Sequence, residues 1–431
     1  CVTMQNLLAL ILAVVATLTL ASAVEPSFKV TVVLDNLASP WDVAIMPDGH
    51  VLYTEKCRGL SISKKAAHTF ETPLRLFGAT GSLLEAPDFF CAGQSGMHGV
   101  AIDPEFGHSN HYIYVFFPST MNRDTTGRRW NHLVRLTLSM DLVSVSQRVD
   151  ILQDIFFKDQ ANGVGGNGAH SGGRIKFGPD GFLYVTTGDN HNATLPQDMR
   201  ALGGKILRVD RDGTAAPDNN MPSGADPRIY VYGLRNSQGI AFRPGTGQIY
   251  ASEHGPAYDD EVTLLVAGGN GGWDPQNRPS LNCPSNYCGY AGVPTTMPMT
   301  DTQRFPAALP PLYVYNNDRR GMCPNEFLIG AQWGAWNGSM LVGILGGKEL
   351  IRLQLNEAGN FVENRQKLKD DVFPAVRYRG LTLGPQGDLF MVADHGVIWR
   401  VSPVTTTAMT TATTTTAAGA TTTTAAGATT T

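Results

Sequence analysis

The stretch RIKFGPDGFLYVTTGD, residues 174–189, carries the pattern that decides the fold. Apolar and polar residues alternate on both sides of a Gly-Pro-Asp-Gly turn, which is typical of a β-hairpin. Hairpins repeated at spacings of about 50 to 75 residues predict blades stacked around an axis. We therefore predict an all-β, six-bladed β-propeller with four-stranded antiparallel blades. The other copies are WDVAIMPDGHVLYTE from Trp41, GVAIDPEFGHSNHYIYVFF from Gly99, GIAFRPGTGQIYASEHG from Gly239, GLTLGPQGDLFMVAD from Gly380 and a degenerate WGAWNGSMLVGILGG from Trp333.

The repeats also decide the domain organisation of the 431-residue chain. Length alone predicts two or three domains. Because the hairpins spread over the whole span with no charged or Pro/Ser-rich linker between them, we expect one domain over residues 24–402. The 47 glycines and 26 prolines are typical of a turn-rich chain. A net charge of −4 gives no electrostatic case for a nucleic-acid partner.

Both ends of the chain differ in composition from the repeats. The apolar run Met4 to Ala23 ends in Ala-Ser-Ala, which predicts a secretory signal peptide over residues 1–23. A membrane anchor is the alternative, which the short run and its cleavage-like end disfavour. Residues 403–431 are almost only Thr, Ala and Gly, so we expect a disordered tail, either plain or an O-glycosylated stalk. These features predict a secreted, extracellular protein without a transmembrane segment.

Export permits disulfide bonds. We expect Cys57 to pair with Cys91 and Cys283 with Cys288, which leaves Cys323 over. Sequence alone does not fix this connectivity. A zinc site is the alternative, but the sequence holds no CxxC pair to support it. Two N-glycosylation acceptors belong on the surface if they are used: Asn192 in NAT and Asn337 in NGS.

Two Gly-rich segments lie next to hairpins, where a propeller gathers its functional loops. GQSGMHG, residues 93–99, offers Gln94 among three glycines that turn sharply or approach a ligand closely. GNGAHSGG places His170 among small residues at the start of a strand. A neutral imidazole there is able to remove a proton from an alcohol. The alternatives are an ordinary Gly-rich turn and a structural histidine.

Two further segments carry charge. GLRNSQGIAF places Arg235 and Asn236 just before a hairpin, where the arginine either forms a salt bridge or stabilises negative charge on an oxygen. SEHGPAYDDEV places an acidic run, residues 259–261, beside Gly255 and Pro256. Carboxylates with backbone carbonyls suit Ca²⁺, and a solvated acidic turn is the alternative.

Cations cluster late in the chain, at Lys348 in GGKELIRL and at Arg377 and Arg379 in VRYRGLTL. Alternation along a strand puts the two arginines on one face. Side by side they repel unless an anion lies between them, and their planar forks suit a multi-carboxylate or phosphate ligand. Pairing with Asp or Glu of a neighbouring blade is the alternative.

Together the segments GQSGMHG, AHSGGRIKFGPDG, GLRNSQGIAF, EHGPAYDDEV, GGK and RYRG, in this order, resemble the glucose/sorbosone dehydrogenase family. These are soluble quinoprotein sugar dehydrogenases that use pyrroloquinoline quinone. The resemblance covers Leu37 to Val401 and implies a six-bladed propeller, in agreement with the repeats.

The resemblance implies roles for the residues singled out above. His170 would take the proton of the sugar's anomeric hydroxyl while hydride passes to the quinone, and Gln94 and Arg235 would contact the substrate. The carbonyls of Gly255 and Pro256 would bind the Ca²⁺ that polarises the quinone. The clustered cations would meet the three carboxylates of pyrroloquinoline quinone. The residues implied to hold the cofactor are Asn236, Lys348, Arg377, Arg379 and, in place of a bacterial Gln, His254.

Two more positions depart from the bacterial pattern. Ala169 stands where glucose-oxidising members carry an Asp that contacts the sugar, and His98 stands where apolar residues are more usual. The cysteines indicate a eukaryotic branch that includes secreted fungal pyranose dehydrogenases.

The leading hypothesis is a secreted oxidoreductase, dependent on pyrroloquinoline quinone and Ca²⁺, that oxidises an aldose or related hydroxy-sugar and passes electrons to an external acceptor. The first alternative is a non-catalytic binding module, as in hedgehog-interacting-like proteins. The second is a Ca²⁺-dependent lactonase, which would leave the paired arginines unexplained.

Overall fold

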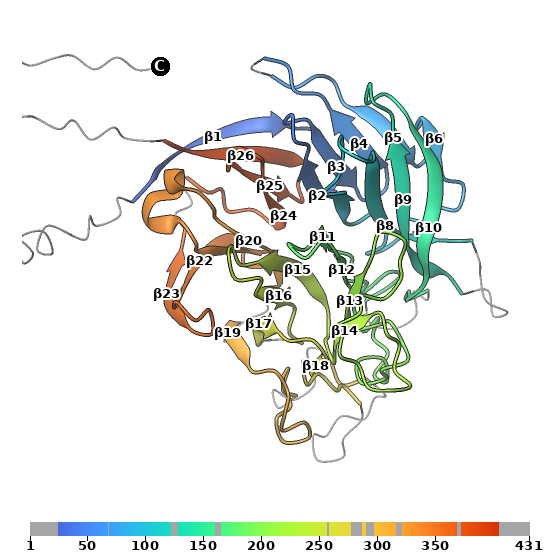
Figure 1. Cartoon of the computed structure of the whole chain (residues 1–431), viewed down its shortest axis with the longest axis vertical. Coiled ribbons are helices and arrows are strands. Elements are labelled where there is room, and N and C mark those ends of the chain that lie inside the picture. Colours follow the sequence, from blue (N-terminus) through green and yellow to red (C-terminus); the bar gives the residue numbers. More distant parts are fainter. Residues whose placement is uncertain are drawn as a thin grey trace, which may run out of the picture.

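A computed structural model describes residues 25–404 apart from 68, 122–127, 160–164, 257, 277–286, 290–296, 316–320 and 369–371. The expected signal peptide at 1–23 and nearly all of the expected tail lie outside the described residues. Within this part, six β-sheets stand around a central axis (Figure 1). The predicted six-bladed propeller is confirmed.

The first three blades follow one another along the chain, each with its innermost strand first. The first consists of β2 (Pro40–Ile45), β3 (Val51–Glu55), β4 (Gly59–Ser63) and β5 (Leu74–Gly78). The second consists of β7 (Val100–Ile102), β8 (Tyr112–Ser119), β9 (Trp130–Leu138) and β10 (Val145–Phe156). The third consists of β11 (Ile175–Phe177), β12 (Leu183–Thr186), β13 (Ile206–Val209) and β14 (Ile229–Tyr232).

The last three blades repeat this plan. The fourth consists of β15 (Ser237–Phe242), β16 (Ile249–Glu253), β17 (Asp260–Leu265) and β19 (Pro311–Tyr315). The fifth consists of β20 (Met322–Phe327), β21 (Met340–Ile344), β22 (Glu349–Leu355) and β23 (Val362–Lys367). The sixth consists of β24 (Tyr378–Leu383), β25 (Leu389–Ala393), β26 (Val397–Val404) and β1 (Ser27–Leu34). Short parallel strands extend the first and third blades: β6 (Leu84–Glu85) and β18 (Gly269–Asn270).

Strand β1 closes the ring. It pairs antiparallel with β26, with Ser27 opposite Val404, and so forms the outer strand of the blade that the end of the chain builds (Figure 1). Glu25, just before β1, accepts a hydrogen bond from Nε1 of Trp336 at 2.5 Å. The two ends of the domain are thereby joined in one sheet.

Five of the six predicted hairpins form where the sequence placed them, and the degenerate copy does not. Trp333 lies in a 3₁₀ helix, η2 (Ala331–Trp336), and the innermost strand of the fifth blade is β20, upstream of it. Two glycines, Gly330 and Gly334, adopt positive φ here and take the chain out of the strand conformation. Trp333 and Trp336 are buried against Phe28 of β1, so this turn packs the fifth blade onto the ring closure.

The core lies between neighbouring blades rather than at a single centre. The inner strands are buried on both faces, as in β3, whereas an outer strand such as β23 is mostly exposed. Each sheet therefore buries apolar side chains against the next, which is the main stabilising term in folding. No helix in the described part of the chain has the length and apolar character needed to cross a membrane.

The structure tests most of the predictions made for the cysteines. Cys57 and Cys91 form the predicted disulfide, and Cys323 is buried and unpaired as predicted. Cys288 is disulfide-bonded, while its predicted partner Cys283 lies outside the described residues. Both glycosylation acceptors are exposed, as their use would require: Asn192 and Asn337.

Candidate active site

A polar cavity of about 510 Å³ lies at the end of the central channel where the innermost strands begin. Its volume falls in the range of small-molecule sites. The innermost strands are equivalent in all six blades, so the residues just before them meet at this end. Except for Lys348, every residue predicted for the site lines this cavity: Gln94, His170, Arg235, Asn236, His254, Gly255, Pro256, Arg377 and Arg379.

His170 is held in a conformation that few side chains adopt. Its φ is +53°, in the left-handed region. The Asn190 side chain donates to its carbonyl at 2.9 Å, and the chain passes so close that a Cβ at Gly188 would lie 2.1 Å from the same oxygen. Gly188 therefore has to be glycine for the two loops to meet. Backbone strain of this kind persists where the surroundings fix it, and it is concentrated at functional sites.

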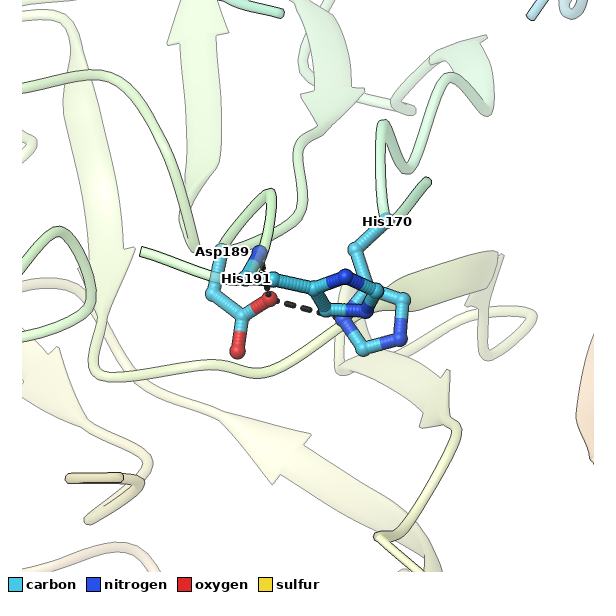
Figure 2. A group of neighbouring side chains, drawn as sticks. All are labelled: His170, Asp189 and His191. Carbon is cyan, nitrogen blue, oxygen red and sulfur yellow. Dashed lines mark hydrogen bonds and ion pairs between the residues drawn. The ribbon is translucent and has the colours of Figure 1, made fainter. Parts of the chain in front are cut away.

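Asp189 orients the His170 ring (Figure 2). Oδ1 of Asp189 lies 2.7 Å from Nδ1 of His170 and accepts the backbone N–H of His191 at 3.0 Å. Its other oxygen, Oδ2, accepts Nε1–H of Trp273 at 2.8 Å and the hydroxyl of Tyr287 at 2.6 Å. Because an ionised carboxylate only accepts, Nδ1 of His170 carries the proton and Nε2 is the basic nitrogen.

The three side chains of Figure 2, His170, Asp189 and His191, are also close enough to be considered as metal ligands, since their ligand atoms lie within 4.8 Å of one another. The Asp189 carboxylate, however, already accepts the four hydrogen bonds described above. The His191 ring packs edge-on against His170, with centroids 3.8 Å apart. We therefore assign the group to orienting His170 rather than to binding a metal.

The surroundings of His170 keep it neutral. Burial lowers its pKa well below the ordinary value, and the positive charges of Arg235 and Lys158 lower the pKa further. Lys158 lies behind the site, with its Nζ 3.3 Å from Nδ1 of His191. A neutral imidazole near neutral pH is the form that accepts a proton.

Arg235 is fixed by backbone groups on both sides. Its Nη1 donates to the carbonyl of His254 at 2.8 Å and its Nη2 to the carbonyl of Gly289 at 2.9 Å. Its backbone N–H donates to Glu253, and its guanidinium lies 5.7 Å from the centroid of the Trp273 ring. Neutral carbonyls hold this cation in place without cancelling its charge, so it remains available to stabilise negative charge on an oxygen.

Asn236 and Gln94 bind neighbouring loops. The Asn236 side chain accepts the N–H of Gly172 at 3.1 Å and so ties the fourth blade to the His170 loop. Gln94 is exposed at the mouth of the cavity, where its side chain donates to the carbonyl of Gly165 at 3.2 Å. Asn236 therefore shapes the base of the cavity, whereas Gln94 lies at its opening.

Cations from the first and sixth blades form one wall of the cavity that His170 also lines. Arg377 donates to Asp394 at 2.9 Å, and Arg379 contacts the same carboxylate oxygen at 3.4 Å. Burial would raise the pKa of Asp394, but Arg379 and Arg377 outweigh it and the pKa is lowered. The carboxylate comes from the same blade as the arginines, not from a neighbouring one. Lys56, which the sequence analysis did not single out, completes the wall.

Lys348 stands apart from the wall. It lies in the turn between β21 and β22, is exposed, and does not line the cavity. Leu345, three residues earlier, lines the cavity in the fifth blade. The structure thus brings together all of the predicted cations except this one.

The turn at Gly255 and Pro256 is shaped by a buried carboxylate. Asp260 accepts the N–H of Gly255 at 2.7 Å and that of Gly321 at 2.6 Å. Burial raises the pKa of Asp260 to about 6. Asp260 and Glu261 are both buried, so this acidic run is not a solvated turn. Beside it, Nε2 of His254 is buried without a hydrogen-bond partner among the described residues.

Several residues that build this site were not predicted from the sequence. Asp189 is the last residue of the repeat copy RIKFGPDGFLYVTTGD, which predicts the fold. Its separation from His170 in the sequence could therefore have been used to predict it as a site residue. Trp273 and Tyr287 come from the segment after β18, which carries no repeat and gave no signal. Lys56 directly follows the first hairpin, in the same position relative to its blade as other site residues.

The chain is similar to several known proteins. The aldose sugar dehydrogenase YliI of Escherichia coli is 27% identical over 385 residues, which is 88% of this chain and 94% of the relative. Quinoprotein glucose dehydrogenase B of Acinetobacter calcoaceticus is 30% identical over 278 residues, or 59% of this chain and 54% of the relative. The PQQ-bound aldose sugar dehydrogenase of Streptomyces coelicolor superposes with a TM-score of 0.64 at 25% identity, covering 88% of this chain and all of that one.

The glucose/sorbosone dehydrogenase family model matches residues 37–400, which is nearly the whole propeller. The chain belongs to the glucose/sorbosone dehydrogenase family.

Proposed function

We propose that this protein is a secreted oxidoreductase, dependent on pyrroloquinoline quinone and Ca²⁺, that oxidises an aldose or related hydroxy-sugar at its anomeric carbon. The observation that carries the proposal is the His170–Asp189 pair, which places a neutral, oriented imidazole in one cavity with a cationic wall. An external electron acceptor would reoxidise the cofactor. Export is supported by the predicted signal peptide and by the Cys57–Cys91 disulfide.

The cavity fits an anionic cofactor. Among the described lining residues, Lys56, Arg235, Arg377 and Arg379 are cationic, and only Asp260 and Asp394 carry carboxylates. Within the described part of the chain, three lining residues also hold buried polar atoms without a hydrogen-bond partner: His98 Nδ1, Arg235 Nε and His254 Nε2. Buried polar atoms are normally paired, so a ligand with several acceptor groups suits this lining. Pyrroloquinoline quinone carries three carboxylates and is such a ligand.

The turn beside the wall suits a hard cation. Gly255 and Pro256 line the cavity, and Asp260 accepts the backbone N–H of Gly255 and, with its other oxygen, that of Gly321. Backbone carbonyls of this turn would hold Ca²⁺, which prefers oxygen ligands. When bound, the quinone supplies a two-electron acceptor for hydride and Ca²⁺ makes it more electrophilic.

The chain's own residues account for the proton. Nε2 of His170 takes the proton of the anomeric hydroxyl while the hydride on the same carbon leaves, so that a C=O bond replaces the C–H and O–H bonds. Asp189 stabilises the imidazolium that forms, as carboxylates do behind other catalytic histidines. Arg235 stabilises the negative charge that develops on the sugar oxygen. Ala169 offers no polar side chain, so recognition of the other sugar hydroxyls falls to groups such as Gln94.

Cofactor binding followed by turnover tests the proposal. Purified protein is mixed with Ca²⁺ and pyrroloquinoline quinone, binding is measured by titration calorimetry, and a panel of aldoses is assayed by reduction of an artificial dye. We expect micromolar or tighter binding that a chelator removes, and dye reduction with at least one aldose. The His170→Ala variant should bind the cofactor equally well and lose about 10²- to 10⁴-fold in kcat.

Two results would contradict the proposal. Absence of cofactor binding at micromolar concentration favours the binding-module alternative, and full turnover in His170→Ala refutes the assigned base. N-terminal sequencing of protein recovered from a culture medium tests export separately. A mature chain beginning near Val24 is the expected result, and retention of the protein inside the cell contradicts it.

A further inference from the structure

We propose that Lys56, rather than Lys348, supplies the ammonium group that binds a carboxylate of the anionic cofactor. The inference rests on the proposed function and adds a binding residue to the same cavity. Lys56 lies at the end of the first hairpin, is half-buried, and lines the cavity together with Arg377 and Arg379. Lys348 is exposed in the turn between β21 and β22 and does not line it.

The backbone holds Lys56 in place. Its N–H donates to the carbonyl of Ser39 at 3.1 Å, and its carbonyl accepts the N–H of Met97 at 2.8 Å. Gly96 passes so close that a Cβ there would lie 2.1 Å from the same carbonyl. The next residue, Cys57, is bonded to Cys91. The disulfide therefore fixes the root of Lys56 to the loop that also carries Gln94.

The side chain of Lys56 is directed along this loop. Its Nζ donates to the carbonyl of Gly93, a neutral acceptor that leaves the charge uncompensated. An ammonium group has three donors, and the remaining ones are able to serve a ligand in the cavity. A lysine acts as a compact point charge, which complements the planar forks of the two arginines.

The positive charges around Lys56 outnumber the negative ones, which favours binding of an anion. Burial, together with the guanidinium of Arg379, lowers the pKa of Lys56, whereas Asp394 acts in the opposite direction. Asp394 already accepts from both Arg377 and Arg379. Three cations on this wall thus share one carboxylate, and a multi-carboxylate ligand placed between them would relieve their repulsion.

The test measures affinity without turnover. Wild-type protein and the variants Lys56→Gln, Lys348→Gln and Lys29→Gln are titrated with pyrroloquinoline quinone in the presence of Ca²⁺. We expect Lys56→Gln to bind about 10- to 100-fold more weakly, the loss typical of a hydrogen bond to a charged group. Lys29 is exposed on β1 and serves as the matched control, which should bind like the wild type. Lys348→Gln should also bind like the wild type.

Two additional measurements separate binding from structure. Lys56→Arg keeps the positive charge and should recover most of the lost affinity. The affinity of Lys56→Gln should fall less steeply with added salt than that of the wild type, because one ionic contact is gone. Thermal unfolding of the apo-proteins shows whether Lys56→Gln is folded like the wild type.

The outcomes are distinguishable. No cofactor binding by the wild type overturns the proposed function and this inference with it. Wild-type binding with equal affinity in Lys56→Gln overturns this inference alone. Weakened binding in Lys348→Gln with unchanged binding in Lys56→Gln assigns the ammonium to Lys348 instead.

Discussion

Two cavities that described residues line along the central channel differ in how their charges are paired. The site cavity, defined above, lies where the innermost strands begin. A second cavity of about 200 Å³, which we call the channel cavity, is lined by the strands themselves, from β2, β7, β11, β15, β20 and β24. There Arg174 pairs with Asp42, and Lys176 pairs with Glu326 of another blade at 2.6 Å. In the site cavity the cations outnumber the carboxylates.

The boundary between the two cavities is a layer of contacts around Arg174. Its guanidinium lies 4.2 Å from the centroid of the Trp41 ring and donates to the carbonyls of Gln238 and Arg379. Trp41, Gln238 and Arg379 line the site cavity, whereas Arg174 and Asp42 line the channel cavity. Charges on one side of this layer are paired within the fold, and charges on the other are those that we propose to bind a ligand. Variants on the two sides should therefore fail in different ways.

The largest effect is expected from Asp189→Asn, beside the His170 that lines the site cavity. The amide has one accepting oxygen and an NH2 group in place of the other, so His170 loses its fixed tautomer and the imidazolium loses its counter-charge. We expect kcat to fall by about 10²- to 10⁴-fold. Cofactor affinity, measured by titration, should stay within about threefold of the wild type, since Asp189 does not line the cavity. A kcat close to that of the wild type would refute the role given to Asp189.

The next effect belongs to the channel cavity and concerns stability. Arg174→Met leaves Asp42 buried without its partner, which typically costs about 3–5 kcal/mol. Chemical denaturation should show this loss, and the double variant Arg174→Met/Asp42→Asn should recover a large part of it. Equal stability of the single variant and the wild type would show that this pair contributes nothing.

The same variant has a pH dependence with a definite sign. Burial already raises the pKa of Asp42, against the lowering effect of Arg174. Removing Arg174 raises the pKa further in the folded state only. A carboxyl group with a raised folded pKa stabilises the fold at low pH and loses that contribution as pH rises. The stability deficit of Arg174→Met should therefore be smaller at pH 5 than at pH 8, and a deficit that grows on acidification would contradict this account.

A smaller effect is expected from Tyr287→Phe, which acts on the site cavity through Asp189. The variant removes one of the four hydrogen bonds to Asp189 and keeps the ring. A carboxylate with fewer donors is more basic, so it holds the proton of His170 more strongly and raises the pKa of that histidine. We expect a fall in kcat of about tenfold, the cost of about one hydrogen bond.

The pH profile separates this role from a structural one. The acid limb of kcat/KM should move to higher pH in Tyr287→Phe. The variant Tyr230→Phe serves as a control on the third blade, outside the cavity lining, and should keep the wild-type profile. If the pH profiles of Tyr287→Phe and the wild type were identical, Tyr287 would contribute only packing and would not affect the pKa of His170.

The same contrast explains what the sequence was able to predict. The hairpins and the residues just before them follow from local periodicity, which is why His170, Arg235 and Arg379 were found. The prediction of the fifth blade's inner strand was wrong because that strand reads MCPNEF. Its proline and its charged residue are not typical of a buried strand. The paired tryptophans downstream gave a false signal for it.

Contacts between distant segments account for the rest of the site. Tyr287 reaches Asp189 across 98 positions from a segment without a repeat, so no pattern links the two residues. Lys348 and Lys56 both follow hairpin strands, and sequence alone does not decide which of them lines the cavity. That choice depends on how the Cys57–Cys91 disulfide and Gly96 position Lys56.

The smallest effect is expected from Lys158→Gln, which removes a charge without touching the cavity lining. Lys158 lowers the pKa of His170 together with burial and Arg235. Glutamine is able to keep the hydrogen bond to His191 while losing the charge, so the pKa of His170 should rise. A base with a higher pKa is protonated at higher pH, and the acid limb of kcat/KM should move upward.

The measurement is the ratio of kcat/KM at pH 5 to that at pH 8. We expect this ratio to fall by a few-fold in Lys158→Gln, since a partly exposed charge is screened by solvent. Lys29→Gln, far from the site on β1, should leave the ratio unchanged. An acid limb that moves to lower pH in Lys158→Gln would mean that Lys158 acts on His170 through packing rather than charge. Burial and Arg235 alone would then keep His170 neutral.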